Sequence, residues 1–238
     1  MCEQLVYKSA VSGQLQVFNR RTNIMNKLQT QSYNFTNLAD PTDAAFLFID
    51  HQSGFLQTIT HVSLAELRNN VRTLAKLANT VKAPVILTGI DPSGASGPII
   101  PEIMIEAPDA ILVERAFEIN AWNNQDFINA VKATGRRTLV ISGIWTSVCA
   151  TFPALSALDD GYTVYAVADA CGDISLQAHE TAVKRWQQAG IIPVSVNSIA
   201  AEMQQTWNRD DANTFRNMYA AIAPHYRALI ESLEGFNT

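Results

Sequence analysis

The sequence predicts an α/β fold: a three-layer α/β/α sandwich built on a six-stranded, mostly parallel sheet. Short apolar runs rich in Val, Ile, Leu and Ala recur along the chain, and such runs are typical of strands buried on both faces. Segments with helical periodicity lie between them. Strands and helices that alternate in this way predict parallel pairing through right-handed crossovers.

Six segments are expected to be strands. They are residues 44–49, 84–87, 110–113, 138–142, 163–168 and 191–196. In sheets of this kind ligands bind at the carboxyl ends of the strands, beside the topological switch point. The residues that follow each strand are therefore the first candidates for a functional site.

The clearest helix begins at Ser63, with Glu66 three residues later as in a capping box and leucines spaced along one face. Further helices are expected over residues 124–134, 148–160, 176–189 and 212–233. Pro224 predicts a break or kink in the last of these, and Pro153 predicts a distorted first turn in the helix that begins at residue 148.

The domain proper is expected to span residues 41–238. Residues 1–40 are polar, rich in Asn, Gln, Ser and Thr, and show no sustained period. They are equally well explained as an arm that packs on a neighbouring subunit and as a disordered tail.

Composition narrows the range of partners. Charged residues make up 16% of the 238 residues against a globular average of about 25%, and 47% are hydrophobic. This balance predicts a homo-oligomer, because one domain would otherwise expose apolar surface. The net charge is -5 and there is no basic run, so neither nucleic acid nor an anionic membrane is an expected partner. A small uncharged or anionic substrate is expected instead.

The cysteines and the apolar runs indicate the compartment. Three cysteines without a CxxC pair argue against a disulfide framework and a structural zinc site, so a reducing cytoplasm is the simplest setting. We expect neither a secretion signal nor a membrane span, because no basic-then-apolar leader and no run of about 18 apolar residues is present.

Two residues after strands are candidates for catalysis. Asp50 follows the first strand, where a turn-forming or helix-capping role is about equally probable. Cys149 lies after the fourth strand in the first turn of a helix, where free N–H groups and the helix dipole favour a thiolate, although a buried structural cysteine is the more common case. Cys171 is expected to be structural, since Asp169 and Asp173 beside it would raise its pKa.

No metal or cofactor is expected. Asp91 follows the second strand, but no histidine lies between His61 and His179, which makes a histidine-rich metal site improbable there. Neither GxGxxG after the first strand nor GxxxxGK[ST] occurs, so the sheet carries no obvious nucleotide-binding motif.

Three segments carry a resemblance to a known family. They are AAFLFIDHQSGFL, ERAFEINAWNNQDFINAVKATGRRTLVISGIWTSVCATFPALSALDDGY and VADACGD. The chain from about Asp43 to Glu231 resembles the isochorismatase-like cysteine hydrolase superfamily and, within it, the YcaC-like hydrolases. The resemblance implies a Rossmann-like α/β/α fold, a homo-oligomer, and hydrolysis of C–N bonds in small amides or related compounds by an Asp-Lys-Cys triad.

The resemblance maps the triad acid to Asp50, the nucleophile to Cys149 and the lysine position to Arg115. The YcaC-like branch is similar in carrying Arg there. The resemblance also implies a cis peptide between Ile144 and Trp145, with the amides of Trp145 and Cys149 as the oxyanion hole. Nicotinamidases of the superfamily bind a metal through an Asp and histidines after the second strand, which this sequence lacks.

These residues predict a cysteine hydrolase that acts through a covalent thioester. Asp50 would accept the thiol proton and Arg115 would hold Asp50 and the thiolate by charge. The candidates to line the substrate pocket are Gln52, Phe55, Asn120, Trp122 and Trp145, and for each aromatic one core packing is at least as probable.

Two other functions remain open. One is a non-catalytic, oligomeric ligand-binding protein of the same fold, because a guanidinium cannot exchange protons as a lysine does. The other is a thiol redox sensor that uses Cys149, although neither Cys2 nor Cys171 is an obvious resolving cysteine.

Overall fold

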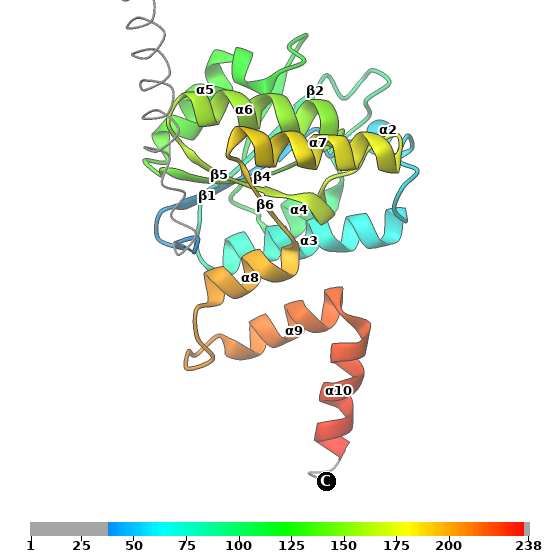
Figure 1. Cartoon of the computed structure of the whole chain (residues 1–238), viewed down its shortest axis with the longest axis vertical. Coiled ribbons are helices and arrows are strands. Elements are labelled where there is room, and N and C mark those ends of the chain that lie inside the picture. The colour runs from blue at the N-terminus through cyan, green and yellow to red at the C-terminus, as the bar shows by residue number, and fades with distance from the viewer. Residues whose placement is uncertain (1–37, 236–238) are drawn as a thin grey trace, which may run out of the picture. The chain divides into compact units, whose positions relative to one another are not determined.

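A computed structural model describes residues 38–235 of the chain, and the side chains as far as residue 232. Its centre is one sheet with the strand order β3-β2-β1-β4-β5-β6, in which every pairing is parallel (Figure 1). The strands are β1 (Ala44–Ile49), β2 (Val85–Ile90), β3 (Ile111–Arg115), β4 (Thr138–Gly143), β5 (Thr163–Val167) and β6 (Ile192–Val194). The predicted α/β fold class is confirmed, with a sheet that is parallel throughout.

β1 shows why the apolar runs form buried strands. All six of its residues are buried, and it pairs with β2 on one side and β4 on the other. Phe46 and Phe48 belong to one hydrophobic core, whereas Leu47 and Ile49 belong to the second core on the opposite face. A continuous apolar run is needed because neither face of this strand meets water.

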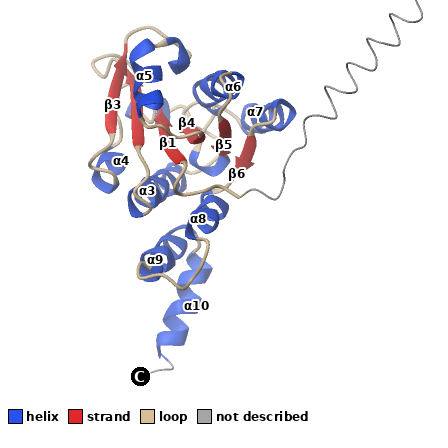
Figure 2. Ribbon diagram, turned by 90° about the vertical axis from the view of Figure 1, so that its left-hand side faces the viewer, coloured by secondary structure: helices blue, strands red, loops and turns tan. Residues whose placement is uncertain are grey.

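Helices cover both faces of the sheet (Figure 2). One face carries α3 (Leu64–Thr80), α4 (Pro101–Glu106) and α8 (Val196–Gln204), and α9 (Ala212–Ile222) packs on the outer side of α3 and α8. The other carries α5 (Gln125–Ala133), α6 (Thr151–Asp159) and α7 (Leu176–Ala189). The three layers that the sequence predicts are therefore present.

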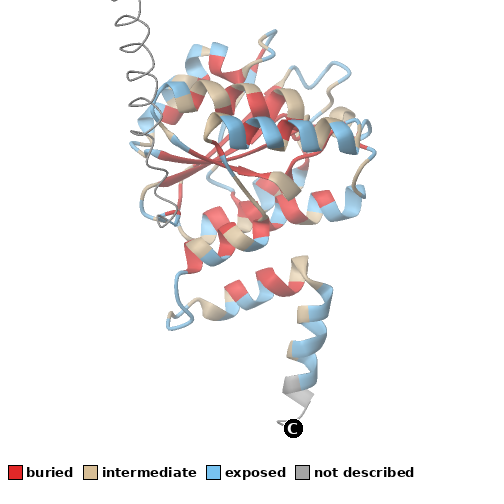
Figure 3. Cartoon of the chain, in the orientation of Figure 1, coloured by how far each residue is buried: buried red, intermediate tan, exposed pale blue. Residues whose placement is uncertain are grey.

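Several helix ends lie where the sequence places them. The Ser63 side chain accepts a hydrogen bond from the Glu66 amide, and Asn124 caps α5 through the Phe127 amide. Pro224 separates α9 from α10 (Pro224–Gly235), as predicted. The described side chains of α10 are mostly exposed (Figure 3).

The prediction of one strand over residues 191–196 is wrong at its end. β6 stops at Val194, and Val196 begins α8 because Ser195 and Ser198 form a capping box there. Three α-helices were not predicted: α8, whose start was assigned to a strand, and the short α2 (Ser53–Leu56) and α4, whose four and six residues give too little periodicity.

The helix expected from residue 148 begins earlier and begins irregularly. A π-helical turn, η2 (Thr146–Ala150), precedes α6, and the Ala150 amide reaches back five residues to the Trp145 carbonyl oxygen. The predicted distortion near Pro153 is thus observed.

The predicted arm, residues 1–40, lies almost wholly outside the described residues and remains a prediction. Among the described helices, none combines the length and apolar character that crossing a bilayer requires.

Candidate active site

The predicted catalytic residues meet at the topological switch point of the sheet. The chain builds outward from β1 through β2 to β3, and then outward in the other direction from β4 to β6, so β1 and β4 are the strands between which the order reverses. Asp50 follows β1, Cys149 follows β4 and Arg115 ends β3. This is the edge of the sheet where open α/β folds bind their ligands.

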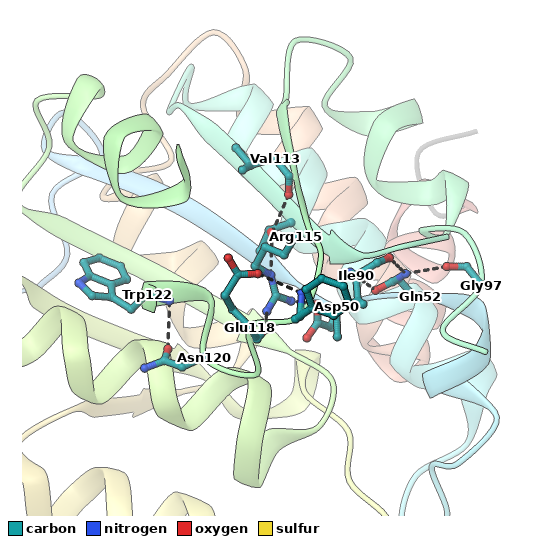
Figure 4. A network of polar contacts seen from close by, with 11 residues as sticks. Asp50, Gln52, Ile90, Gly97, Val113, Arg115, Glu118, Asn120 and Trp122 are labelled. Atoms are coloured by element: carbon teal, nitrogen blue, oxygen red, sulfur yellow. Dashed lines mark hydrogen bonds and ion pairs between the residues drawn. The ribbon is translucent and has the colours of Figure 1, made fainter. Parts of the chain in front are cut away.

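Asp50 and Arg115 form a buried ion pair (Figure 4). Both side chains are fully buried, and an Arg115 Nη2 hydrogen donates to Asp50 Oδ1. The other two guanidinium nitrogens also donate hydrogen bonds. Nε donates to Thr88 Oγ1 at 3.0 Å, and Nη1 donates to the Glu118 carbonyl oxygen at 2.5 Å. The guanidinium is therefore held in one orientation with its charge directed at Asp50.

Asp50 is constrained in its backbone as well as in its side chain. Its φ of 57° lies in the left-handed region, which non-glycine residues occupy mainly at turns and functional sites. Its amide donates to the Thr88 carbonyl oxygen at 2.9 Å, which fixes the carboxyl group at the end of β1. Burial raises the pKa of Asp50, and the charge of Arg115 opposes this shift. A raised pKa brings the carboxylate closer to the range of an effective base at neutral pH.

Cys149 faces this carboxylate. Its residue is 6% exposed, and it lies near enough to Asp50 that each group shifts the pKa of the other. Burial and the Asp50 charge raise the pKa of the thiol, whereas the Trp145 backbone N–H and Arg115 lower it by less. Burial beside a carboxylate thus opposes the helix N-terminus and the cation, which by themselves favour a thiolate.

One oxygen of Asp50 is left without a hydrogen bond. Oδ1 accepts from Arg115, and within the described chain Oδ2 has no hydrogen-bond partner. A buried carboxylate oxygen without a donor is uncommon and is often found at catalytic sites.

The peptide between Ile144 and Trp145 is cis, as the resemblance implies. The Trp145 N–H faces the sulfur of Cys149, since it is one of the groups that lower the thiol pKa. Around it, the Trp145 ring packs edge to face on Phe55 with centroids 5.6 Å apart, and its Nε1 donates to Thr58 Oγ1 at 2.6 Å. Phe55 and Trp145 thus form one aromatic wall next to the turn that carries the nucleophile.

Gln52 has a different environment from the one expected of a substrate ligand. It is buried, its Nε2 donates to the carbonyl oxygens of Ile90 and Gly97, and its Oε1 accepts from the Ile90 amide at 2.9 Å. Figure 4 shows this amide bridging the end of β2 to the following loop. Gln52 fixes that loop with the hydrogen bonds that a substrate would otherwise use.

Asn120 and Trp122 lie to one side of the Asp50–Arg115 pair (Figure 4). Asn120 donates to Ser156 Oγ and accepts from the Trp122 amide, while Trp122 Nε1 donates to Asp160 at 2.9 Å. The Trp122 ring belongs to the core beneath α5 and α6. The structure gives both side chains partners within the protein, so their role toward substrate remains a prediction.

Cys171 has the surroundings expected of a structural residue. It is 1% exposed, and its sulfur accepts a hydrogen bond from the Gly143 amide at 3.2 Å. Burial raises the pKa of its thiol to about 12, and the charges of Asp169 and Asp173 add to this effect, as predicted.

The residues at the end of β2 do not suit the metal site of nicotinamidases. Asp91 is exposed and its Oδ1 accepts from the amide and hydroxyl of Ser93, which makes it part of a turn. Among residues 38–235, no three His, Cys, Asp or Glu side chains gather closely enough to hold a metal ion.

Sequence reasoning missed several residues of the site. Thr88 Oγ1 accepts a hydrogen bond from Arg115 Nε and donates one to the Val113 carbonyl oxygen, and the Glu118 carbonyl oxygen accepts from the guanidinium Nη1. Asp173 was considered only for its effect on Cys171, yet its carboxylate accepts from the Ser147 amide at 2.7 Å in the nucleophile turn. Thr88 lies within β2 near its end and Asp173 lies in the segment after β5, and these positions were the only signal for the two residues.

Comparison with known proteins identifies the family of the chain. The isochorismatase domain model matches residues 44–198. The chain is 38% identical to the probable hydrolase YcaC of Escherichia coli over 195 residues, which is 82% of this chain and 93% of the relative. The structure of the E. coli protein, described as an octameric hydrolase of unknown specificity, covers 84% of this chain and 97% of its own with a TM-score of 0.81.

A second solved structure is similar to the same degree. YcaC from Pseudomonas aeruginosa, with hexane-2,5-diol and covalent acrylamide, has a TM-score of 0.80 at 39% identity and covers 83% of this chain and 98% of its own. With the domain match and the buried Asp50, Arg115 and Cys149, these likenesses place the chain in the isochorismatase family of hydrolases, among its YcaC-like members.

Proposed function

We propose that this hydrolase cleaves a C–N bond of a small amide or related compound through a covalent thioester on Cys149. The observation that carries the proposal is the buried Cys149 thiol beside Asp50, whose Oδ1 is held by Arg115 and whose Oδ2 has no partner within residues 38–235. A protonated nucleophile next to a fixed base is the arrangement that nucleophilic catalysis requires.

In the first half of the reaction the Cys149 sulfur attacks the substrate carbon, and its proton passes to Asp50 Oδ2. The negative charge that forms on the substrate oxygen is stabilised by the amides of Trp145 and Cys149, each worth on the order of 3 kcal/mol in acyl transfer. The C–N bond then breaks, Asp50 returns the proton to the leaving nitrogen, and a thioester remains.

In the second half Asp50 takes a proton from water as the water oxygen attacks the thioester carbon. The C–S bond breaks, the acid product leaves and the sulfur recovers a proton from Asp50. Arg115 keeps its charge throughout and moves no proton, so its role is to keep Asp50 ionised and oriented. The pKa of Asp50, raised by burial, suits a group that must both accept and return a proton.

The substrate pocket is proposed to lie against the aromatic wall of Phe55 and Trp145. Both side chains are partly buried and border the turn of Cys149. Asn120, Trp122 and Gln52 support this region through their hydrogen bonds to the protein. A small, largely uncharged substrate is proposed, because the site's charges already pair with one another.

We also propose a homo-oligomer, the state described for the E. coli relative as an octamer. Large apolar side chains are exposed on the edge strand β3 and on the loop after it, with Phe117 93% exposed, Ile119 64%, Ile111 51% and Leu112 47%. A monomer would leave this patch in water next to the active site.

The test of the proposed function is ammonia release from a panel of small amides, carbamoyl compounds and nitriles, with Cys149→Ala as the control. Mass spectrometry of enzyme quenched during turnover should find an acyl group on Cys149. If the protein binds panel compounds but releases no ammonia and carries no adduct, the proposed hydrolase activity is wrong and the non-catalytic ligand-binding hypothesis is supported.

A further inference from the structure

The turn that carries the nucleophile is held from outside by the segment that follows β5. The amides of Thr146 and Ser147 come at the start of a helix, where N–H groups lack partners within the helix. Here the Thr146 amide donates to the Gly172 carbonyl oxygen at 2.8 Å, and the Ser147 amide donates to Asp173 Oδ2 at 2.7 Å. Residues 172 and 173 therefore supply partners for two consecutive amides of this turn.

Asp173 is a buried carboxylate whose two oxygens both accept hydrogen bonds from backbone amides. It is fully buried, and its other oxygen, Oδ1, accepts from the Ile174 amide at 2.8 Å. A buried carboxylate is tolerated when hydrogen bonds satisfy its oxygens, and bonds from backbone N–H groups stabilise its charged form. Both oxygens of Asp173 are used in this way.

The peptide group between Thr146 and Ser147 is hydrogen-bonded at both its N–H and its carbonyl oxygen. The peptide unit that joins Thr146 to Ser147 has its N–H on Asp173, while its carbonyl oxygen, that of Thr146, accepts from Thr151 Oγ1 at 2.6 Å. Thr151 is in turn fixed by Trp186 Nε1, which donates to it at 2.8 Å. One peptide plane, between Trp145 and Cys149 in the chain, is thus clamped at both ends by buried side chains.

We infer that Asp173 is a positioning residue for catalysis: by holding the Ser147 amide, it sets the orientation of the nucleophile turn and hence of the Trp145 and Cys149 amides toward the reacting carbon. The inference rests on the proposed function of those amides as the oxyanion hole. In this inference Asp173 acts through the Ser147 amide and not on the substrate.

The test compares two alkylating agents of similar size on Cys149. Acrylamide develops negative charge on its amide oxygen as the thiol adds, so its rate depends on oxyanion donors. Iodoacetamide sends its charge to the departing iodide, so its rate reports access and thiol reactivity alone. The ratio of the two rate constants, measured by mass spectrometry on the full-length protein, isolates the donors.

The variants are Asp173→Ala, Asp173→Asn and, as the matched control, Asp169→Ala. Asp169 lies in the same segment, and its Oδ1 accepts from the Val196 amide at 2.7 Å, away from the nucleophile turn. Asparagine at position 173 retains one oxygen that can accept from Ser147.

We expect the acrylamide-to-iodoacetamide ratio to fall about tenfold in Asp173→Ala, less than the 10²–10³ loss for removing an oxyanion donor, because the donors are misdirected and not deleted. The ratio for Asp173→Asn should stay within about threefold of the wild-type ratio, and the ratio for Asp169→Ala should equal the wild-type ratio. An unchanged ratio in Asp173→Ala, or an equal fall in Asp169→Ala, overturns the inference.

If Asp173→Ala does not fold, Asp173→Ser takes its place, with the same fall expected and an unchanged ratio again overturning the inference. No hydrolysis is needed for this measurement. A wild-type protein that alkylates at Cys149 but releases no ammonia would therefore defeat the proposed hydrolase activity while Asp173 is still tested.

Discussion

Replacing Arg115 by alanine isolates the role of the buried ion pair. The side chains of Arg115 and Asp50 are both fully buried, and Thr88 Oγ1 and the Glu118 carbonyl oxygen lose a donor in the same change. Removing one partner of a buried pair leaves an uncompensated charge, which typically lowers the free energy of unfolding by about 3–5 kcal/mol. We expect Arg115→Ala to be destabilised by that amount at neutral pH.

The loss of unfolding free energy in Arg115→Ala should depend on pH, because it depends on whether Asp50 is ionised. Burial already raises this pKa in the wild type, and without Arg115 it rises further. A carboxyl whose folded pKa exceeds its unfolded pKa favours the folded state at low pH, and this advantage disappears as the pH rises through the folded pKa. The difference in unfolding free energy between the wild type and Arg115→Ala should therefore be largest at neutral pH and shrink toward about pH 4.

Urea unfolding of five proteins, the wild type, Arg115→Ala, Asp50→Asn, the double variant and a control, measures both effects. Arg137→Ala is the matched control, because its pair with Asp43 spans 3.3 Å and its side chain is 87% exposed, a kind of pair worth about 0–1 kcal/mol. The double variant Asp50→Asn/Arg115→Ala should be less destabilised than the sum of the single changes, since it removes both charges. If Arg115→Ala unfolds within about 0.5 kcal/mol of the wild type and shows no pH dependence relative to it, the ion pair does not stabilise the site as argued.

The same variant tests the chemistry. The charge of Asp50 raises the pKa of the Cys149 thiol and the charge of Arg115 lowers it, so removing Arg115 should raise this pKa. The pH profile of Cys149 alkylation should shift upward in Arg115→Ala and shift less in Arg115→Lys, which keeps the charge without the planar fork. Superimposable profiles would mean that Arg115 takes no part in the site.

Four further outcomes follow from the same contacts. Asp50→Asn should abolish ammonia release while leaving binding intact, because an amide cannot take the thiol proton; turnover above a tenth of the wild-type rate would exclude Asp50 as the base. Iodoacetamide should modify Cys149 faster than Cys171, whose thiol is buried with a pKa raised to about 12, and the reverse order in peptide mapping would reassign the nucleophile. Light scattering should give a mass that is a multiple of 26.1 kDa, and a monomer at micromolar concentration would contradict the proposed oligomer. Activity should survive a chelator, whereas a stoichiometric transition metal whose removal abolishes turnover would refute metal-independent chemistry.

The strands could be predicted from the sequence because a strand buried on both faces appears as a continuous apolar run. Every residue of β1 is buried, so the run from Ala44 to Ile49 is apolar without interruption. β6 lies at the edge and is only three residues long, and the adjoining residue Val196 has the same apolar character while beginning a helix. The decision between strand and helix there rests on the Ser195–Ser198 capping box, a local hydrogen-bond pattern that hydrophobicity alone does not reveal.

The site could be located from strand ends, but its charges could not. A helix N-terminus beside a cation favours a thiolate in isolation, and Cys149 occupies that position. The outcome depends on two quantities absent from the chain's local pattern, the depth of burial and the distance to Asp50, and both raise the pKa of the thiol. Both effects favour the protonated thiol, and in the proposed mechanism its proton moves within the buried cluster that Arg115 orients. A buried thiol kept protonated in this way is a weaker target for oxidants than an exposed thiolate, which favours hydrolysis over the redox-sensor hypothesis for Cys149.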